Sequence, residues 1–282
     1  MFKKIVRFLF VILARQRISI ALSKGALSQN LRKIDQSDPK TWEFSAFSQN
    51  GEDGIIEYLC ANIKVPNRYF IEIGSSDGVE NNSAFLAIVK KYSGLMIEGN
   101  KSASALSKKI MSSMNLGVEA INTFVTKDNV SVLLKSALHS NPDFFSLDID
   151  GNDYYVAENL FNAGLRPAIV AVEYNSTLGD EKALTINYQE NFDFTKAHAS
   201  ELYYGVSIKA WKKFFESLNY KFVTVDQNGV NAFFLDPERF EDKFYKSIKG
   251  YDYKENFYEL RKFKQNNNKR FELIKNMDFV NI

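Results

Sequence analysis

Three carboxylates lie within six residues, at Asp148, Asp150 and Asp153, directly after a short apolar run. Negative charges this close repel one another unless a cation or hydrogen-bond donors offset them. Another acid and an amide, Glu173 and Asn175, follow the next apolar run. Carboxylate and amide oxygens suit hard divalent cations such as Mg²⁺, Ca²⁺ or Mn²⁺, although Asp and Asn are equally favoured as helix N-caps.

The segment from Glu72 to Gly78 has the composition of a ligand-binding turn. Its glycines permit a close backbone approach and unusual φ, while Glu72 places a carboxylate at the end of the preceding apolar run. Glu98 ends the next apolar run, where an acid can accept hydrogen bonds from ribose hydroxyls. These features indicate a nucleotide-like ligand. The dinucleotide fingerprint is missing because Ser76 and Val79 stand where it needs glycine, which disfavours a dehydrogenase.

Short apolar runs alternate with helix-length segments from residue 69 onward, which is typical of βαβ units in a parallel sheet. A helix and an antiparallel hairpin are predicted to end this pattern, because Asn228-Gly229 separates two β-rich runs. The predicted strands cover 69–73, 95–98, 118–122, 144–148, 168–173, 220–225 and 230–235, and the predicted helices cover 83–92, 102–114, 130–138, 154–163 and 208–218.

The chain has 282 residues, 45% of them hydrophobic and 25% charged, as expected for one α/β domain with tails. We divide it into an N-terminal helical segment at 1–46, a domain at 47–237 with an insertion at 174–202 over the active site, and a helical tail at 238–282. The balance of 36 basic and 34 acidic residues disfavours nucleic acid as a partner. One cysteine and two histidines exclude a disulfide framework and a Cys/His zinc site, which fits a cytoplasmic protein.

Residues 1–17 are basic and aromatic, with seven apolar residues at 8–14 between Arg7 and Arg15. A bilayer span needs about 20 apolar residues, and a signal peptide needs a small-residue cleavage site as well. Two alternatives remain for this segment. It forms a helix docked on the domain, or a helix that lies in the interface of an anionic membrane and holds the protein at its inner face. Association into a homo-oligomer is a further prediction.

Several short blocks, in the order in which they occur, resemble the FkbM-type class I methyltransferases, which use S-adenosylmethionine. The resemblance covers about 47–235. It rests on Ser48-Gln49-Asn50-Gly51-Glu52-Asp53, Phe70-Ile71-Glu72-Ile73-Gly74, Asp77-Gly78, Asn81-Asn82, Ile97-Glu98-Gly99, Leu147-Asp148-Ile149-Asp150-Gly151-Asn152-Asp153-Tyr154, Val172-Glu173-Tyr174-Asn175, Tyr204-Gly205-Val206-Ser207 and Asn231-Ala232-Phe233-Phe234. The resemblance implies a Rossmann-like, doubly wound sheet of seven strands with an antiparallel last strand. It also implies O-methylation of a hydroxyl on a sugar or glycan precursor.

Matched position by position, Glu72, Gly74 and Gly78 fall on the first cofactor motif of the family, and Glu98 falls on its ribose-binding acid. The predicted cofactor site also includes Gln49, Ser75, Asp77, Asn82, Gly99 and Asp148. Ser76 departs from the glycine that many class I enzymes carry. Asp148, Glu173 and Asn175 are similar in placement to the metal ligands of the Mg²⁺-dependent class I O-methyltransferases, so the resemblance implies a divalent cation here. Such a cation would lower the pKa of the acceptor hydroxyl.

The general base and the acceptor pocket are predicted from residue types. His198, in the insertion, is the first candidate for the base because histidine is the residue type most often used for proton transfer, and Asp150 and Asp153 are its rivals. Tyr174, Asn175 and Tyr204 are the residues that we expect to line the acceptor pocket.

Two other functions compete with methyl transfer. A glycosyltransferase would use Asp148-Ile149-Asp150 as a D-x-D pair that holds a divalent cation and a nucleotide sugar, but this leaves Glu72 and Glu98 unexplained. A non-catalytic interaction module held at the membrane by residues 1–17 is the other alternative, and the acids at every strand end argue against it.

Overall fold

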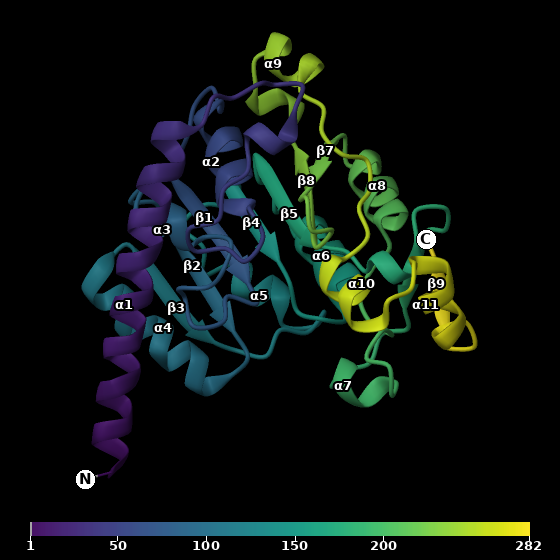
Figure 1. Cartoon of the computed structure of the whole chain (residues 1–282), viewed down its shortest axis with the longest axis horizontal. Coiled ribbons are helices and arrows are strands. Elements are labelled where there is room, and N and C mark those ends of the chain that lie inside the picture. The colour runs from purple at the N-terminus through teal and green to yellow at the C-terminus, as the bar shows by residue number, and fades with distance from the viewer. Residues whose placement is uncertain (1) are drawn as a thin grey trace.

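A computed structural model describes residues 2–282, with side chains described from residue 12 onward. Seven strands form the central sheet, in the order β3-β2-β1-β4-β5-β8-β7 (Figure 1). The strands are β1 (Tyr69–Ile73), β2 (Ser93–Glu98), β3 (Val118–Asn122), β4 (Phe144–Leu147), β5 (Ile169–Glu173), β7 (Lys221–Val225) and β8 (Asn231–Leu235).

The first five strands are parallel to one another, whereas β8 is antiparallel to both β5 and β7. The chain begins in the middle of the sheet at β1, proceeds outward through β2 and β3, and then returns to build the other half from β4. Five parallel strands followed by a hairpin whose last strand inserts antiparallel beside β5 are the topology of the class I methyltransferase fold. The predicted fold class is therefore confirmed.

Helices cover both faces of the sheet because the side chains of each strand alternate between two apolar clusters. Phe70 and Phe144 pack against the first group of helices, whereas Ile71 and Phe145 face the second. The first group is α1 (Phe2–Leu31), α2 (Glu52–Ala61), α3 (Ala84–Ile88) and α4 (Lys101–Met114), and the second is α5 (Val130–Leu134), α6 (Asp153–Asn162) and α8 (Ile208–Ser217). Helix α3 is shorter than predicted because Lys91 turns through a left-handed conformation, at φ 58°, to enter β2.

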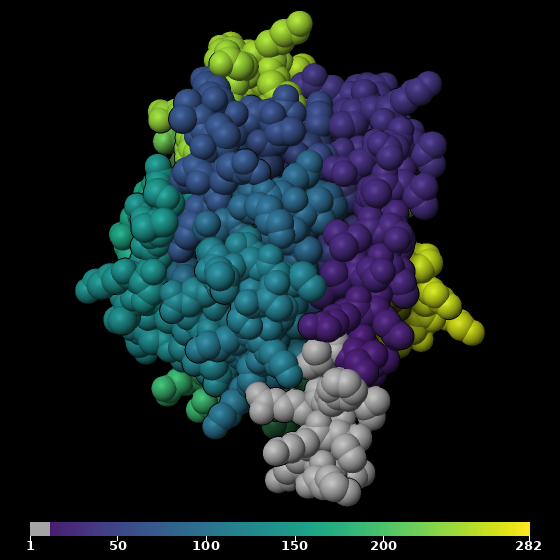
Figure 2. Space-filling model, turned by 90° about the vertical axis from the view of Figure 1, so that its left-hand side faces the viewer, coloured from purple at the N-terminus to yellow at the C-terminus, as the bar shows by residue number. Residues whose placement is uncertain are grey.

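Residues 12–31 of helix α1 lie along the side of the domain, where Figure 2 shows them in purple. Ala14, Ile18 and Ala21 are buried in the first apolar cluster, so residues 12–31 dock as one alternative predicted. Leu13 and Ile20 remain exposed on its outer side. Among the described residues, no helix has the combination of length and hydropathy that a membrane span requires. The side chains of residues 1–11, which carry much of the membrane prediction, lie outside those described.

The insertion and the C-terminal tail pack together, because strand β6 of the insertion pairs antiparallel with β9 at the chain end. A third apolar cluster, which includes Leu184, Tyr203 and Ile274, joins them. The predicted tail helices are present, but the two strands were not predicted. These elements and the remaining short helices are η1 (Pro39–Thr41), η2 (Ser176–Leu178), β6 (Leu184–Ile186), α7 (Phe194–Ala197), η3 (Pro237–Arg239), α9 (Asp242–Ser247), α10 (Phe257–Phe263), α11 (Asn267–Ile274) and β9 (Phe279–Asn281).

Candidate active site

A cavity of about 610 Å³ opens at the carboxyl ends of the parallel strands. It lies at the switch point between β1 and β4, where open α/β sheets bind ligands. Nine of the predicted site residues line it: Gln49, Glu72, Gly74, Asn82, Glu98, Gly99, Asp148, Asp150 and Glu173.

Gly74 lines the cavity where the ends of β1 and β4 meet. Its φ is +88°, and a Cβ built on it would lie 1.6 Å from the backbone oxygen of Asp148. The ends of β1 and β4 therefore approach too closely for any side chain at this position. Gly78 also needs to be glycine, because its φ is +76° and a Cβ would lie 2.4 Å from Ser107 Oγ, but it does not line the cavity.

The strand-end glutamates of β1 and β2 organise the loops around the cavity. Glu72 accepts hydrogen bonds from the backbone N–H of Asn82 at 2.9 Å and of Ser83 at 3.1 Å, and from the Ser83 hydroxyl. Burial raises the pKa of Glu72 to about 7. Glu98 accepts from the N–H of Ser76 at 2.8 Å and of Asn100 at 2.6 Å. Both carboxylates thus hold the cavity's loops while they line it.

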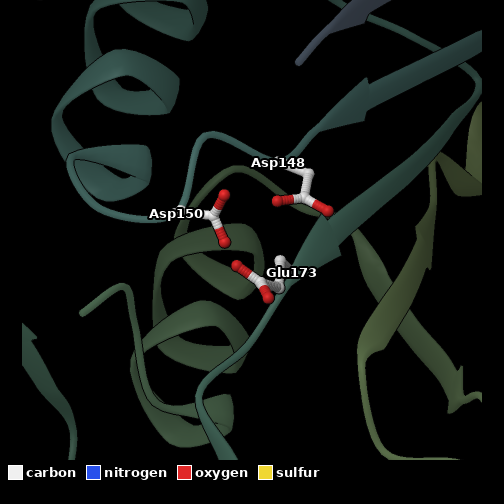
Figure 3. Close-up of side chains that lie close together, drawn as sticks. All are labelled: Asp148, Asp150 and Glu173. Carbon is white, nitrogen blue, oxygen red and sulfur yellow. The ribbon is translucent and has the colours of Figure 1, made fainter. Parts of the chain in front are cut away.

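The acids that follow β4 and β5 form a cluster. One carboxylate oxygen from each of Asp148, Asp150 and Glu173 lies within 4.8 Å of the others, and the three side chains point toward one another (Figure 3). No ion pair between described residues includes any of them. Burial and the neighbouring acids raise the pKa of Asp148 and Glu173 well above the usual range. Three hard oxygen donors with no counter-charge fit a divalent cation.

Asp150 and Asp153 have different roles in the turn between β4 and α6. Asp150 adopts a left-handed backbone at φ 53°, which turns its carboxylate toward the cluster, and burial together with Asp153 raises its pKa to about 6. Asp153 is buried, accepts hydrogen bonds from the N–H of Ile149 at 2.9 Å and of Gly151 at 2.8 Å, and does not line the cavity. The carboxylate of Asp153 therefore holds the turn and lies outside the cavity lining.

The predicted acceptor residues lie behind the cavity wall. Asn175 caps η2 by accepting from Thr177 N at 2.9 Å, and its amide nitrogen donates to Leu202 O at 2.8 Å and Tyr204 O at 3.0 Å. Its polar atoms have partners within the fold, and it does not line the cavity. Tyr174 is buried and donates to Lys254 O at 2.6 Å, and Tyr204 is buried beside Glu259 at 3.3 Å.

His198 also lies away from the cavity lining. It follows α7, and its Nδ1 pairs with the Ser200 hydroxyl at 2.8 Å. Phe192, from the same insertion, lines the cavity, whereas His198 does not. The prediction of His198 as base is therefore not supported by its position.

Two residues of the predicted cofactor loop, Ser75 and Asp77, do not line the cavity. Ser75 is fully buried and does not line the cavity. Asp77 accepts from the N–H of Val79 at 3.0 Å and forms an ion pair with Arg17 of α1 at 2.7 Å. Arg17 also pairs with Glu80 at 2.6 Å, so α1 is tied to the loop that follows β1.

Part of the cavity wall comes from segments to which the sequence assigned no role. Asn231 begins β8, and Asn256 and Tyr258 belong to the start of α10 in the tail. These and other cavity residues without a predicted role are Ser48, Asn50, Glu52, Ile73, Ser76, Glu80, Asn81, Ile97, Asn100, Thr123, Phe124, Val125, Ile149, Asn152, Phe192, Val230, Asn231, Asn256 and Tyr258.

A buried ion-pair network holds the tail against the domain. Arg270 of α11 is fully buried and pairs with Glu255 at 3.1 Å and Glu259 at 3.2 Å. It also donates to the hydroxyls of Ser176 and Thr177, both at 3.2 Å, in the turn after β5. This network fixes α10 and therefore the part of the cavity wall that α10 supplies.

Comparison with solved structures finds methyltransferases at low similarity. An O-methyltransferase from Bacillus cereus in complex with SAH is 13% identical, with a TM-score of 0.42 over 78% of this chain and 89% of that chain. A SAM-dependent methyltransferase from Aquifex aeolicus is 10% identical, with a TM-score of 0.40 over 72% of this chain and 100% of that chain. A human methyltransferase 10 domain containing protein is 10% identical, with a TM-score of 0.40 over 78% and 95%.

No family model matches the sequence, and no curated protein matches it. Because these TM-scores are low, the assignment of the fold depends on strand order and direction. By that criterion, the chain has the class I methyltransferase fold, with its cavity at the switch point of the sheet.

Proposed function

We propose that this protein is an S-adenosylmethionine-dependent O-methyltransferase that acts on a hydroxyl of a sugar or glycan precursor. The observation that carries the proposal is the division of one cavity into two chemically different ends. One end has a glycine turn and a strand-end glutamate, and the other has three clustered acids. The first end suits a nucleoside cofactor, and the second suits activation of a hydroxyl group.

The cofactor end lies over β1 and β2. The carboxylate of Glu98 has lone pairs beyond those used by its two backbone donors, so it can also accept hydrogen bonds from ribose hydroxyls. Phe124, which is 54% exposed, offers a planar apolar surface at the cavity wall against which a base can pack. Gly74 lets the ends of β1 and β4 approach each other closely, and it lines the cavity where the cofactor's polar tail would lie.

The acceptor end lies over β4, β5 and β8. Its wall is rich in amides, with Asn50, Asn231 and Asn256, and the ring of Tyr258 is 52% exposed at its edge. Amide groups and an accessible aromatic ring suit a hydroxyl-rich acceptor, because amides offer both donors and acceptors. In the transfer, the acceptor oxygen forms a bond to the methyl carbon as the carbon–sulfur bond breaks, and the electron pair remains on sulfur.

Asp150 is the proposed proton acceptor. Of the three predicted bases, it is the one that lines the cavity. Its carboxylate faces the acid cluster at the end of the cavity where the acceptor hydroxyl would lie. The hydroxyl proton passes to one of its oxygens as the new carbon–oxygen bond forms.

Asp148, Asp150 and Glu173 would hold a divalent cation at this end. Such a cation, when bound, lowers the pKa of an acceptor hydroxyl and orients it. Asp150 can serve both purposes because a carboxylate has two oxygens, each with two lone pairs.

Calorimetric titration with S-adenosylhomocysteine tests the proposed function. We expect micromolar binding that survives chelation of metals. Glu98→Gln should weaken it by roughly 1 to 3 kcal/mol, because charged hydrogen bonds to the ribose are lost. Glu119→Gln is the matched control, since Glu119 is an exposed glutamate on the neighbouring strand β3 and should leave affinity unchanged. Unchanged affinity in a folded Glu98→Gln protein would remove Glu98 from the cofactor site.

A glycosyltransferase is the second candidate, because Asp148 and Asp150 of the D-x-D pair do lie in one carboxylate cluster. Titration with nucleotide sugars, with and without Mn²⁺, distinguishes the two functions. Binding of a nucleotide sugar alone, and solely with metal present, would replace the methyltransferase proposal. If neither class of ligand bound, a non-catalytic role would be favoured.

A further inference from the structure

Asn231 has a buried amide oxygen without a partner. It is the first residue of β8, it is 3% exposed, and it lines the cavity. Its Nδ2 donates to Glu52 Oε1 at 3.0 Å, whereas no described group donates to its Oδ1. Buried polar atoms normally have a hydrogen-bond partner, so an unpaired oxygen at a cavity wall indicates a ligand.

The orientation of this amide is fixed by Glu52, which is 1% exposed. Glu52 itself accepts from the N–H of Asn50 at 2.8 Å and of Gly51 at 2.9 Å, and from Asn50 Nδ2 at 2.9 Å. If the Asn231 amide were flipped, its oxygen would face the Glu52 carboxylate and two acceptors would meet. The nitrogen therefore stays on Glu52, and the oxygen is left to accept from, or coordinate, something else.

The register of the sheet places Asn231 beside the acid cluster. In the antiparallel pair of β5 and β8, Asn231 lies directly opposite Glu173. Directly opposed residues project from the same face of a sheet, with Cβ atoms about 4.5–5.5 Å apart. Both residues line the same cavity, and Glu173 contributes an oxygen to the cluster.

We propose that Asn231 Oδ1 is the neutral oxygen ligand of a divalent cation held by Asp148, Asp150 and Glu173. It takes the place that the sequence suggested for Asn175, whose amide is used to hold the insertion. The inference rests on the cation of the proposed function and adds a ligand from a third strand. Carboxylate and amide oxygens together match the ligand preference of Mg²⁺ and Mn²⁺.

Titration of the metal-free, full-length protein with Mn²⁺, followed by calorimetry and by the electron paramagnetic resonance signal of free Mn²⁺, tests this inference. We expect Asn231→Ala to weaken Mn²⁺ binding about tenfold or more, the scale found for groups around metal sites. Asn81→Ala is the matched control. Asn81 is 8% exposed, lines the same cavity and also has an unpartnered Oδ1, but its Nδ2 donates to Ser75 O in the β1 loop. Its loss should leave Mn²⁺ affinity unchanged.

Asn231→Asp separates ligation from a structural role. It keeps an oxygen at the site but loses the hydrogen bond to Glu52, so it retains Mn²⁺ binding if the oxygen is a ligand and loses it, as alanine does, if the bond to Glu52 is what matters. Wild-type affinity in Asn231→Ala, an equal loss in Asn81→Ala, or no Mn²⁺ binding by the wild type would overturn the inference. S-adenosylhomocysteine binding, measured without metal, reports the proposed function separately. It should persist in the folded Asn231 variants, and its absence in the wild type would refute the proposed function alone.

Discussion

The acids at the two ends of the cavity have opposite relations to the fold. Glu72 and Glu98, at the ends of β1 and β2, each accept backbone hydrogen bonds from the loops around them. Asp148 and Glu173, at the ends of β4 and β5, face one another and Asp150. No ion pair between described residues offsets their charge.

The first pair of acids holds the loops that build the site, whereas the second pair remains free to bind a ligand. A buried carboxylate with several N–H donors repays part of its desolvation within the folded chain. Clustered carboxylates without donors destabilise the folded chain until a cation or protons arrive. The acids of the β1–β2 end therefore have hydrogen-bond donors within the fold, whereas no ion pair between described residues offsets the charges at the β4–β5 end.

The largest effect is expected at the point where the two ends touch. Gly74→Ala would push a Cβ to 1.6 Å from Asp148 O in a backbone with φ +88°. We expect a loss of about 3 kcal/mol or more in the free energy of unfolding, because two strand ends must separate. Gly164→Ala is the control, since its φ is +101° but nothing lies within 4 Å of the added Cβ. A similar loss in both variants, measured by urea unfolding, would attribute the effect to φ alone.

The next-largest effect is expected at Glu72, whose carboxylate holds the loop after β1. Glu72→Gln keeps the shape of the side chain but places an NH₂ group where three donors converge. We expect this variant to be destabilised by about 1 to 3 kcal/mol. Thermal and urea unfolding at pH 7 measure it. A neutral result would mean that the loop does not depend on this carboxylate.

At the β4–β5 end of the cavity, the same glutamate-to-glutamine substitution should stabilise the folded state. Glu173→Gln removes one negative charge from the cluster, so repulsion with Asp148 falls and the folded state gains about 1 kcal/mol at pH 8 in the presence of a chelator. Urea unfolding beside Glu72→Gln measures both signs in one series. Destabilisation by Glu173→Gln under chelation would break the comparison, because it would show that this carboxylate is already satisfied.

The smallest expected effect is a change in how the free energy of unfolding depends on pH. The pKa of Asp148 and Glu173 is raised by burial and by neighbouring acids, and that of Asp150 is raised to about 6. A raised pKa means that the folded state holds protons more tightly, so stability is greatest below the unfolded value of about 4 and falls as pH rises. We expect the urea midpoint of the wild type to fall more steeply than that of Glu173→Gln between pH 5 and 8. Parallel curves would contradict the raised pKa values.

Local sequence patterns were sufficient for the sheet and for the acids at its strand ends. The apolar runs define β1 to β5, and parallel strands end at one edge, so Glu72, Glu98, Asp148 and Glu173 had to meet there. The alternation of side chains within a strand also explains why Tyr174 does not line the cavity. Val172 and Tyr174 pack in the same apolar cluster, so the residue between them is the one that faces the cavity.

Residues that reach the cavity through tertiary contacts could not be predicted in this way. Asn256 and Tyr258 come from the tail, and their place depends on the buried Arg270, which no local pattern indicates. Asn231 did carry a signal. It is a polar residue beside the apolar run Ala232–Leu235, and an amide there needs a partner or a ligand. His198 was predicted from its chemistry alone, and chemistry without a predicted backbone path gives no position.

The dependence of the cavity wall on α10 and Arg270 has a consequence for how the protein is made. Domains form as the chain emerges, beginning with the N-terminal part, so the seven-stranded sheet can assemble while the tail is still being synthesised. Residues 256–258 are set in place by residue 270, and the insertion is paired with residues 279–281 at the chain end. The part of the cavity wall that the tail supplies can therefore form only once these residues have been synthesised, and a chain that stops before residue 256 has the sheet but lacks this part of the pocket.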